Sequence, residues 1–163
     1  SIRTRAVKAS VLLDDRIRQA LALARRDAER HAGFFLDLDG FKSVNDHLGH
    51  EVGDIVLREI SRRLVAATRE TDTISRLGGD EFFLLVQDIG SCDAAAHLAE
   101  KLIELIEQPV AGLPPALTLS ASIGICLFPR SGLDATAEAI IRRADQAMYR
   151  VKAAGKRGYF LAD

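Results

Sequence analysis

The sequence predicts an α+β fold in which helices surround a mixed central β-sheet. Two observations carry this prediction. Segments typical of helices and of strands interleave along the chain, and apolar runs at residues 74–77 and 82–86 flank Gly78 and Gly79 as the strands of a β-hairpin do. A hairpin adds an antiparallel pair to the sheet, which argues against a doubly wound parallel fold. The length of 163 residues suits one domain with a sizeable core.

Apolar residues that recur every three or four positions predict the helices. The first nine residues are basic and polar, and the periodic segments that follow predict helices over residues 11–31, 41–47, 50–68, 92–108 and 136–154. Gly49 and Gly155 end two of these helices and Pro109 ends a third, as glycine and proline commonly do. We also expect His31 and His97 to lie on helix surfaces.

Short apolar runs predict the strands. Residues 33–39 form an apolar run that ends in acids, which is typical of a buried central strand, and residues 117–128 show the alternation of a strand. Residues 159–161 are expected to add an edge strand, so that the sheet has about five strands plus hairpin. The aromatic residues expected in the core are Phe34, Phe35, Phe82, Phe83 and Phe128.

The overall composition excludes several classes of protein. The formal net charge of -1 gives no general bias toward nucleic acid or membrane surfaces, and no apolar run approaches the ~20 residues of a membrane span. Cys92 and Cys126 share no metal-like spacing, which favours a reducing, cytoplasmic setting. Because the chain begins at Ser1 rather than Met, we expect a fragment of a longer protein whose membrane or sensor modules lie outside it.

Two acidic pairs form the first candidate site. Asp37 and Asp39 lie two residues apart on a predicted strand and therefore point to the same side of the sheet. If the hairpin lies beside that strand, Asp37 meets Asp80 and Glu81, and their mutual repulsion raises their pKa values. Mg²⁺ or Mn²⁺ would relieve this repulsion, because both cations accept oxygen ligands. The alternative for Asp80 and Glu81 is an ordinary solvated turn.

Basic residues complement the acids. The helix predicted after Gly40 begins with Phe41, where free backbone N–H groups could bind phosphate, and Lys42 adds a positive charge. Lys152 and Lys156, near the end of the last helix, could hold further phosphate oxygens. A solvated face or a favourable helix dipole would explain each lysine alone. Metal-binding acids combined with phosphate-binding bases are typical of phosphoryl or nucleotidyl transfer.

Asn45 and Asp54 are candidates for base recognition. A carboxylate can accept hydrogen bonds from the N1–H and the amino group of guanine, and an amide can both donate and accept. Helix capping and interaction with a helix dipole are the alternatives, and the residue types alone do not decide between them.

Five motifs together resemble the GGDEF domain of the diguanylate cyclase family. They lie, in family order, at residues 37–46, 49–54, 76–82, 122–124 and 144–156, so the resemblance covers residues 33–161. It implies a fold similar to nucleotidyl cyclases and polymerase palm domains. It also implies the condensation of two GTP molecules into cyclic di-GMP with release of two pyrophosphates, in a homodimer in which each domain binds one GTP.

The resemblance assigns roles to individual residues. Asp37 and Glu81 would bind Mg²⁺ or Mn²⁺ through their side chains, and Leu38 through its carbonyl oxygen. Asp80 would help bind the metal or help deprotonate the attacking 3′-hydroxyl. The catalytic set would be Asp80, Glu81 and Lys42. The substrate-binding set would be Gly40, Phe41, Lys42, Asn45, Asp54, Gly78, Gly79, Lys152 and Lys156. Lys156 stands where the family often has Arg, which keeps the charge but loses the bidentate fork.

Arg69 and Asp72 form a further candidate site. On residue types alone they are an ordinary ion pair near a helix end. Their position before Gly78 resembles the RxxD product-binding site of the family. The resemblance therefore implies an inhibitory cyclic di-GMP site at Arg69 and Asp72, with Lys101 as a weaker candidate for the same pocket.

The N-terminal region departs from the family pattern. Members usually carry a turn resembling Leu-Thr-Gly-Leu-x-Asn-Arg before the first helix, and residues 4–10 match it poorly. Residues 38–42 also resemble GGDEF domains fused to EAL phosphodiesterase domains. The alternatives are a catalytically silent module that senses GTP or cyclic di-GMP for an attached domain and, with less support, a dimerisation scaffold. We expect one domain over residues 1–163, with a linker and helix over 1–32 and a catalytic core over 33–161.

Overall fold

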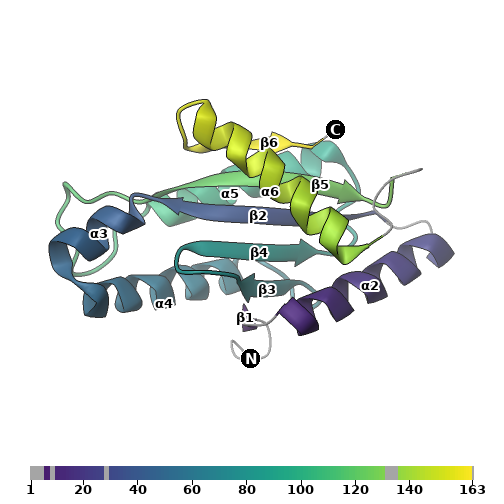
Figure 1. The fold of residues 1–163 in the computed structure, drawn as a ribbon, viewed down its shortest axis with the longest axis horizontal. Coiled ribbons are helices and arrows are strands. Elements are labelled where there is room, and N and C mark those ends of the chain that lie inside the picture. The colour runs from purple at the N-terminus through teal and green to yellow at the C-terminus, as the bar shows by residue number, and fades with distance from the viewer. Residues whose placement is uncertain (1–5, 8–9, 28–29, 131–135, 163) are drawn as a thin grey trace.

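A computed structural model describes residues 6–7, 10–27, 30–130 and 136–162. This part of the chain folds into a six-stranded sheet and five helices (Figure 1). The strands are β1 (Ala6–Val7), β2 (His31–Asp39), β3 (Thr73–Arg76), β4 (Glu81–Val86), β5 (Ser120–Phe128) and β6 (Gly158–Leu161). The helices are α2 (Ser10–Asp27), α3 (Phe41–Leu48), α4 (His50–Ala66), α5 (Cys92–Glu107) and α6 (Ala137–Ala153).

The sheet is mixed and has the strand order β1-β3-β4-β2-β5-β6. β2 pairs antiparallel with both β4 and β5, whereas β1 pairs with β3, and β5 with β6, in parallel. β3 and β4 form the expected antiparallel hairpin. This mixture of antiparallel and parallel pairs, with helices between the strands, confirms the predicted α+β class.

Helices cover both faces of the sheet, because the side chains of each strand alternate between the faces. Phe34, Leu36 and Leu38 of β2 join the core cluster that includes residues of α4 and α5, whereas Phe35 joins the cluster of α2 and α6. The five phenylalanines expected in the core are all buried. Figure 1 shows α6 crossing in front of the sheet and α5 behind it. Among the described helices, none combines the length and apolar character needed to cross a membrane.

Gly124 of β5 allows α6 to lie directly on the sheet. A Cβ atom at this position would overlap the carbonyl oxygen of Ala144 and the amide nitrogen of Met148. Only glycine leaves the space that this close backbone approach requires. The contact places the C-terminal turn of α6 near the acidic end of β2, where Lys152 forms ion pairs with Asp37 and Asp39.

The first helix was predicted to extend further than it does in the structure. Helix α2 ends at Asp27 instead of continuing to residue 31, while residues 28–29 lie outside the described part of the chain. His31 is a fully buried residue of β2, so its expected place on a helix surface is wrong. Its Nδ1 accepts a hydrogen bond from the backbone N–H of Asp88 (2.9 Å), and its ring lies 5.7 Å from that of Phe128. These distant partners, and not local periodicity, determine where the strand begins.

Two further differences concern strands. β5 begins at Ser120 and not at residue 117, because the N–H of Leu117 closes a local turn by donating to the carbonyl oxygen of Pro114 (3.0 Å). β1 was not predicted, since two residues carry no recognisable strand pattern. It pairs in parallel with β3, with Ala6 opposite Ile74. The other residues of the poorly matching stretch 4–10, apart from Ser10, lie outside the described part of the chain.

Candidate active site

The two acidic segments meet because β2 and β4 are neighbouring strands. Asp37 lies directly opposite Glu81 in the antiparallel register, and the backbone N–H of Leu38 donates to the carbonyl oxygen of Asp80 (3.0 Å). Leu36 and Phe82, adjacent to Asp37 and Glu81, point into the cluster of α4 and α5, so the two carboxylates lie on the opposite, α6 face. The predicted meeting of Asp37 with the hairpin is therefore confirmed.

Asp37 and Glu81 are destabilised as anions. Burial and the charge of Asp80 raise the pKa of Asp37 to about 6, and the ammonium of Lys152 only partly opposes this shift. Burial and the charges of Asp80 and Asp145 also raise the pKa of Glu81 above its ordinary value. Oδ1 of Asp37 is buried and has no hydrogen-bond partner among the described residues. A cation at this point would relieve both the repulsion and the lost hydration.

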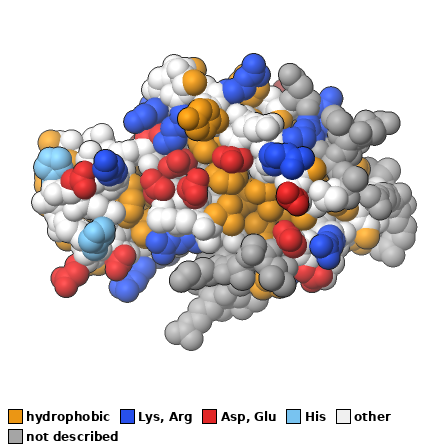
Figure 2. Space-filling view, viewed as in Figure 1, with side chains coloured by type: hydrophobic (Ala, Val, Ile, Leu, Met, Phe, Trp, Pro, Cys, Tyr) orange, Lys and Arg blue, Asp and Glu red, His pale blue; other side chains and the backbone are white. Residues whose placement is uncertain are grey.

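The arrangement fits a divalent cation that is bound partly by the backbone. Within the described ranges, no three His, Cys, Asp or Glu side chains are arranged to hold a metal ion by themselves. The expected set instead combines the carboxylates of Asp37 and Glu81 with the carbonyl oxygen of Leu38, and such oxygen ligands suit Mg²⁺ or Mn²⁺. Figure 2 shows several carboxylates gathered on the face that α6 crosses.

Lys152 supplies positive charge at the edge of this cluster. Its Nζ lies 2.5 Å from Oδ1 of Asp39 and 3.6 Å from Oδ1 of Asp37. Burial by itself lowers the pKa of Lys152, but the hydrogen bond to Asp39 and the charge of Asp37 raise it above its ordinary value. Lys152 is therefore a charged group that already has carboxylate partners before any phosphate arrives.

Arg76 fixes the glycine turn of the hairpin. Its Nε donates to the carbonyl oxygen of Gly78 (3.0 Å), and its Nη2 donates to that of Gly79 (3.2 Å). The backbone N–H of Leu77 donates to the carbonyl oxygen of Glu81 (2.9 Å) and closes the turn. The backbone expected to approach GTP is thus held by a side chain outside it.

Asn45 and Asp54 come from consecutive helices that meet at Gly53. A Cβ atom on Gly53 would overlap Oδ1 of Asn45, so glycine lets this amide lie against α4. Oδ1 of Asn45 is buried and has no hydrogen-bond partner among the described residues, whereas the side chain of Asp54 is exposed. The structure therefore leaves the hydrogen-bonding capacity of Asn45 Oδ1 unused by the described residues, and it exposes the carboxylate of Asp54.

The other residues expected to bind phosphate form no ion pair with the described part of the chain. Helix α3 begins at Phe41 after Gly40, and the side chain of Phe41 is buried, so only the backbone of this turn could face a ligand. Lys42 and Lys156 are exposed, and neither forms an ion pair with a residue that the structure describes. Of the three expected phosphate-binding lysines, the structure therefore brings Lys152 to the acids.

The Arg69–Asp72 segment differs from an ordinary exposed ion pair. Asp72 is 3% exposed, and its two carboxylate oxygens accept hydrogen bonds from the backbone N–H groups of Arg69 (2.9 Å) and Gln87 (3.1 Å). The guanidinium of Arg69 lies 3.6 Å from Asp72, donates to the carbonyl oxygen of Gln87 and remains exposed. Asp72 therefore ties the turn before β3 to the end of β4. Lys101 is exposed on α5, and no contact with Arg69 is seen among the described residues.

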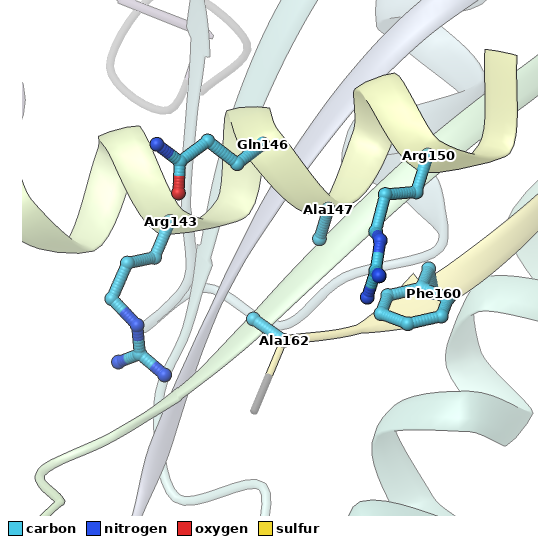
Figure 3. Close-up of a pocket in the computed structure, with 6 residues that line it drawn as sticks. All are labelled: Arg143, Gln146, Ala147, Arg150, Phe160 and Ala162. Carbon is cyan, nitrogen blue, oxygen red and sulfur yellow. The ribbon is translucent and has the colours of Figure 1, made fainter. Parts of the chain in front are cut away.

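A pocket of about 360 Å³ lies elsewhere, between α6 and β6 (Figure 3). The residues that line it are Arg143, Gln146, Ala147, Arg150, Phe160 and Ala162. The guanidinium of Arg150 lies over the Phe160 ring, 4.7 Å from its centre. None of the predicted site residues lines this pocket, so it is separate from the acidic cluster.

Three residues near the cluster were not assigned from the sequence: Arg76, Ser122 and Asp145. Each lies within one of the family motifs, which was the available signal. Their contacts could not be inferred, because each partner comes from another segment or depends on the shape of a turn. Ser122, for example, donates its hydroxyl to Asp39, which is distant in the sequence (3.0 Å).

Comparison with known proteins gives one family along most of the chain. The family described as "Diguanylate cyclase, GGDEF domain" matches residues 7–158. The chain is 49% identical over 149 residues to the bifunctional diguanylate cyclase/cyclic di-GMP phosphodiesterase MucR of Pseudomonas aeruginosa, which covers 91% of the chain but 21% of MucR. It is 39% identical over 141 residues to the diguanylate cyclase TpbB of the same organism, covering 85% of the chain and 32% of TpbB. The chain thus spans about a fifth to a third of these relatives.

A solved structure shows the same fold. The crystal structure of the GGDEF domain of TpbB (YfiN) from Pseudomonas aeruginosa matches with a TM-score of 0.88 at 34% sequence identity. The match covers 98% of this chain and 98% of that domain. The mixed sheet and its surrounding helices are therefore those of a known domain type.

Proposed function

The chain belongs to the GGDEF family of diguanylate cyclase domains, and we propose that it condenses two GTP molecules into cyclic di-GMP with release of two pyrophosphates. One observation carries this proposal. Asp37 and Glu81 face each other across β2 and β4, and both have raised pKa values, as expected for the acids of a cation-binding site.

The acidic cluster would hold the metal and the reacting end of the nucleotide. Asp37 and Glu81 would bind Mg²⁺ or Mn²⁺ through carboxylate oxygens, with the carbonyl oxygen of Leu38 as a third ligand. The metal would supply positive charge to the triphosphate. Asp80 would act at the 3′-hydroxyl or as a further ligand, because its backbone is tied to Leu38 while its side chain is partly exposed.

The remaining assigned residues would bind and orient GTP. Lys42, Lys152 and Lys156 would hold phosphate oxygens together with the backbone at Gly40 and Phe41, and the turn at Gly78 and Gly79 would lie against the nucleotide. Asn45 and Asp54 would read guanine, which is supported by the unpartnered amide oxygen of Asn45. Each domain would carry one GTP, so that two domains must face each other in a homodimer for the 3′-hydroxyl of one GTP to attack the α-phosphate of the other.

The same proposal extends to the domains attached to this one and to its place in the cell. The core would cover residues 33–161, and sensor or EAL domains would be attached in the complete protein. The relative MucR is named as both a diguanylate cyclase and a cyclic di-GMP phosphodiesterase, and the chain covers 21% of it. GTP is an abundant cytoplasmic nucleotide and both cysteines are free thiols, so we place the domain in the cytoplasm.

Product inhibition would use the Arg69 segment. Arg69 presents an exposed guanidinium that could bind a phosphate or guanine of cyclic di-GMP, with Lys101 as a second cation. Asp72 would act mainly by fixing Arg69, because both of its oxygens already accept backbone hydrogen bonds.

Substitution of Asp80 tests the reaction. Asp80→Ala keeps the backbone carbonyl that bonds to Leu38, so the fold should persist while product formation falls by a factor of roughly 100 or more. The assay is chromatography of products from concentrated, artificially dimerised protein with Mg²⁺ and GTP. Glu104→Ala, which removes an exposed carboxylate of α5 on the other face of the sheet, is the matched control and should keep wild-type activity.

The same assay separates the enzyme from a silent sensor. If the wild-type protein binds GTP but forms no cyclic di-GMP, the sensing alternative replaces the enzyme. If Asp80→Ala retains turnover, the acidic cluster is not the reaction site.

A further inference from the structure

Asp39 is a buried carboxylate to which the proposed reaction assigns no role. It is the last residue of β2, and its side chain is 9% exposed. Hydrogen bonds reach it from β5, from α6 and from the segment that follows α6. A buried carboxylate is stable only when hydrogen bonds and charges replace its lost hydration, and these partners supply both.

The contacts of Asp39 direct one oxygen at Lys152. The hydroxyl of Ser122 lies 3.0 Å from each carboxylate oxygen, and the backbone N–H of Arg157 donates to Oδ2 (3.1 Å). The guanidinium of Arg157 is bonded instead to Glu107, through Nε (2.5 Å) and Nη2 (2.9 Å), so it does not compete for Asp39. The shortest contact of Asp39 is the one in which Oδ1 accepts from Nζ of Lys152 at 2.5 Å.

Lys152 still has donors for another ligand. An ammonium group carries three N–H donors, and the bond to Asp39 uses one of them. Nζ also lies 3.6 Å from Asp37, and the side chain is 23% exposed. The ammonium is therefore fixed beside the acidic cluster and remains accessible from the surface.

We propose that Asp39 is the positioning residue of Lys152. It holds the ammonium where it partly offsets the charge of Asp37 in the nucleotide-free domain, and where it donates to the phosphates of GTP once the nucleotide is bound. Fixing a long lysine side chain costs conformational entropy. Because Asp39 already fixes Lys152 in the nucleotide-free domain, this cost does not reduce the affinity for GTP. The inference rests on the proposed function, since it takes GTP as the ligand.

The first test concerns the nucleotide-free protein. The chain has five lysines, so NMR of lysine labelled at Cε can resolve them, and Lys152→Arg assigns the signal. The Cε order parameter of Lys152 should stand well above those of the exposed Lys42 and Lys156. Asp39→Asn should lower it to their level, because the amide can still accept from Ser122 and Arg157 but no longer bears charge. A mobile Lys152 in the wild-type protein would overturn the inference.

The second test is a double-mutant cycle on the KM for GTP. Asp39→Asn and Lys152→Ala should each raise KM about tenfold or more, with a smaller change in kcat, as expected for loss of a charge-assisted contact. If Asp39 acts through Lys152, Asp39→Asn adds nothing in the Lys152→Ala background. A multiplicative effect of the two changes would mean that Asp39 has a merely structural role and would refute the proposal.

A control variant and a second binding assay distinguish failure of this inference from failure of the proposed function. Glu104→Ala, which removes an exposed carboxylate of α5 that does not contact Asp39 or Lys152, should leave KM unchanged. If the wild-type domain forms no product, the proposed function fails, and the same cycle is then measured on the dissociation constant for inorganic pyrophosphate with Mg²⁺. Equal pyrophosphate affinity in wild type and Asp39→Asn would contradict positioning by Asp39.

Discussion

Asp37 and Asp72 are both largely buried carboxylates with a cationic side chain 3.6 Å away, yet their hydrogen bonding differs. Each oxygen of Asp72 accepts a backbone N–H, and an arginine lies beside it. Oδ1 of Asp37 has no hydrogen-bond partner among the described residues, and its pKa is raised by burial and by Asp80. Burial of an acid therefore does not by itself mark a ligand site. What marks it is hydrogen-bonding capacity that the described protein groups leave unused.

The difference has a consequence for stability. Asp72 links two segments and should stabilise the fold, because its partners would otherwise be unpaired backbone donors. Asp37 should destabilise the empty domain whenever it is ionised, since folding removes water and adds neighbouring negative charge. If the acidic cluster binds the proposed cation, the cluster trades stability of the metal-free domain for affinity toward that cation.

The largest effect on stability is expected at Asp72. Asp72→Ala leaves the N–H groups of Arg69 and Gln87 without their acceptor and should lower the free energy of unfolding by about 2–4 kcal/mol. Urea unfolding followed by circular dichroism measures this loss. Glu70→Ala, an exposed neighbour, should change it by less than about 0.5 kcal/mol. A loss at Asp72 no larger than this control would remove the contrast between the two acids.

Asp37→Asn should act in the opposite direction. The folded pKa is about 6, above the ordinary 3.8, so the unfolded chain loses this proton first as pH rises. Stability should therefore fall between about pH 4 and pH 6, and the full cost should persist above pH 6. Asp37→Asn should remove this fall and stabilise the metal-free domain by about 1–3 kcal/mol near pH 8, with little effect near pH 4.

Thermal unfolding across pH, with and without Mg²⁺, checks this prediction. Mg²⁺ should stabilise the wild-type protein above pH 6, where Asp37 is ionised, and should have much less effect on Asp37→Asn. Equal stabilisation of both proteins by Mg²⁺ would show that the cation binds without Asp37.

The smallest change in stability is expected at Arg69. Its guanidinium is 55% exposed, so Arg69→Ala should lower the free energy of unfolding by less than about 1 kcal/mol. It should nevertheless relieve inhibition by cyclic di-GMP, as measured from product inhibition curves. Arg58→Ala, an exposed arginine of α4, should leave inhibition unchanged. Unchanged inhibition in Arg69→Ala would place any product site elsewhere.

Much of the fold followed from local patterns. Periodicity located the helices, and the glycine pair located the hairpin that brings Asp80 and Glu81 to Asp37. The sites that escaped prediction depend on partners from distant segments. His31 was misplaced because Asp88 and Phe128 hold it in β2, and the tie between Asp39 and Lys152 spans most of the chain.

Residue types at fixed spacing were sufficient to predict the five helices, every strand except β1, the class of fold and the family. How the charged groups are used depends on the tertiary structure. It left Oδ1 of Asp37 without a hydrogen bond from the described residues, satisfied Asp72 with backbone donors and joined Asp39 to Lys152. The physical reason is that the energy of a buried charge depends on every group around it, and these groups come together only when the sheet and helices pack.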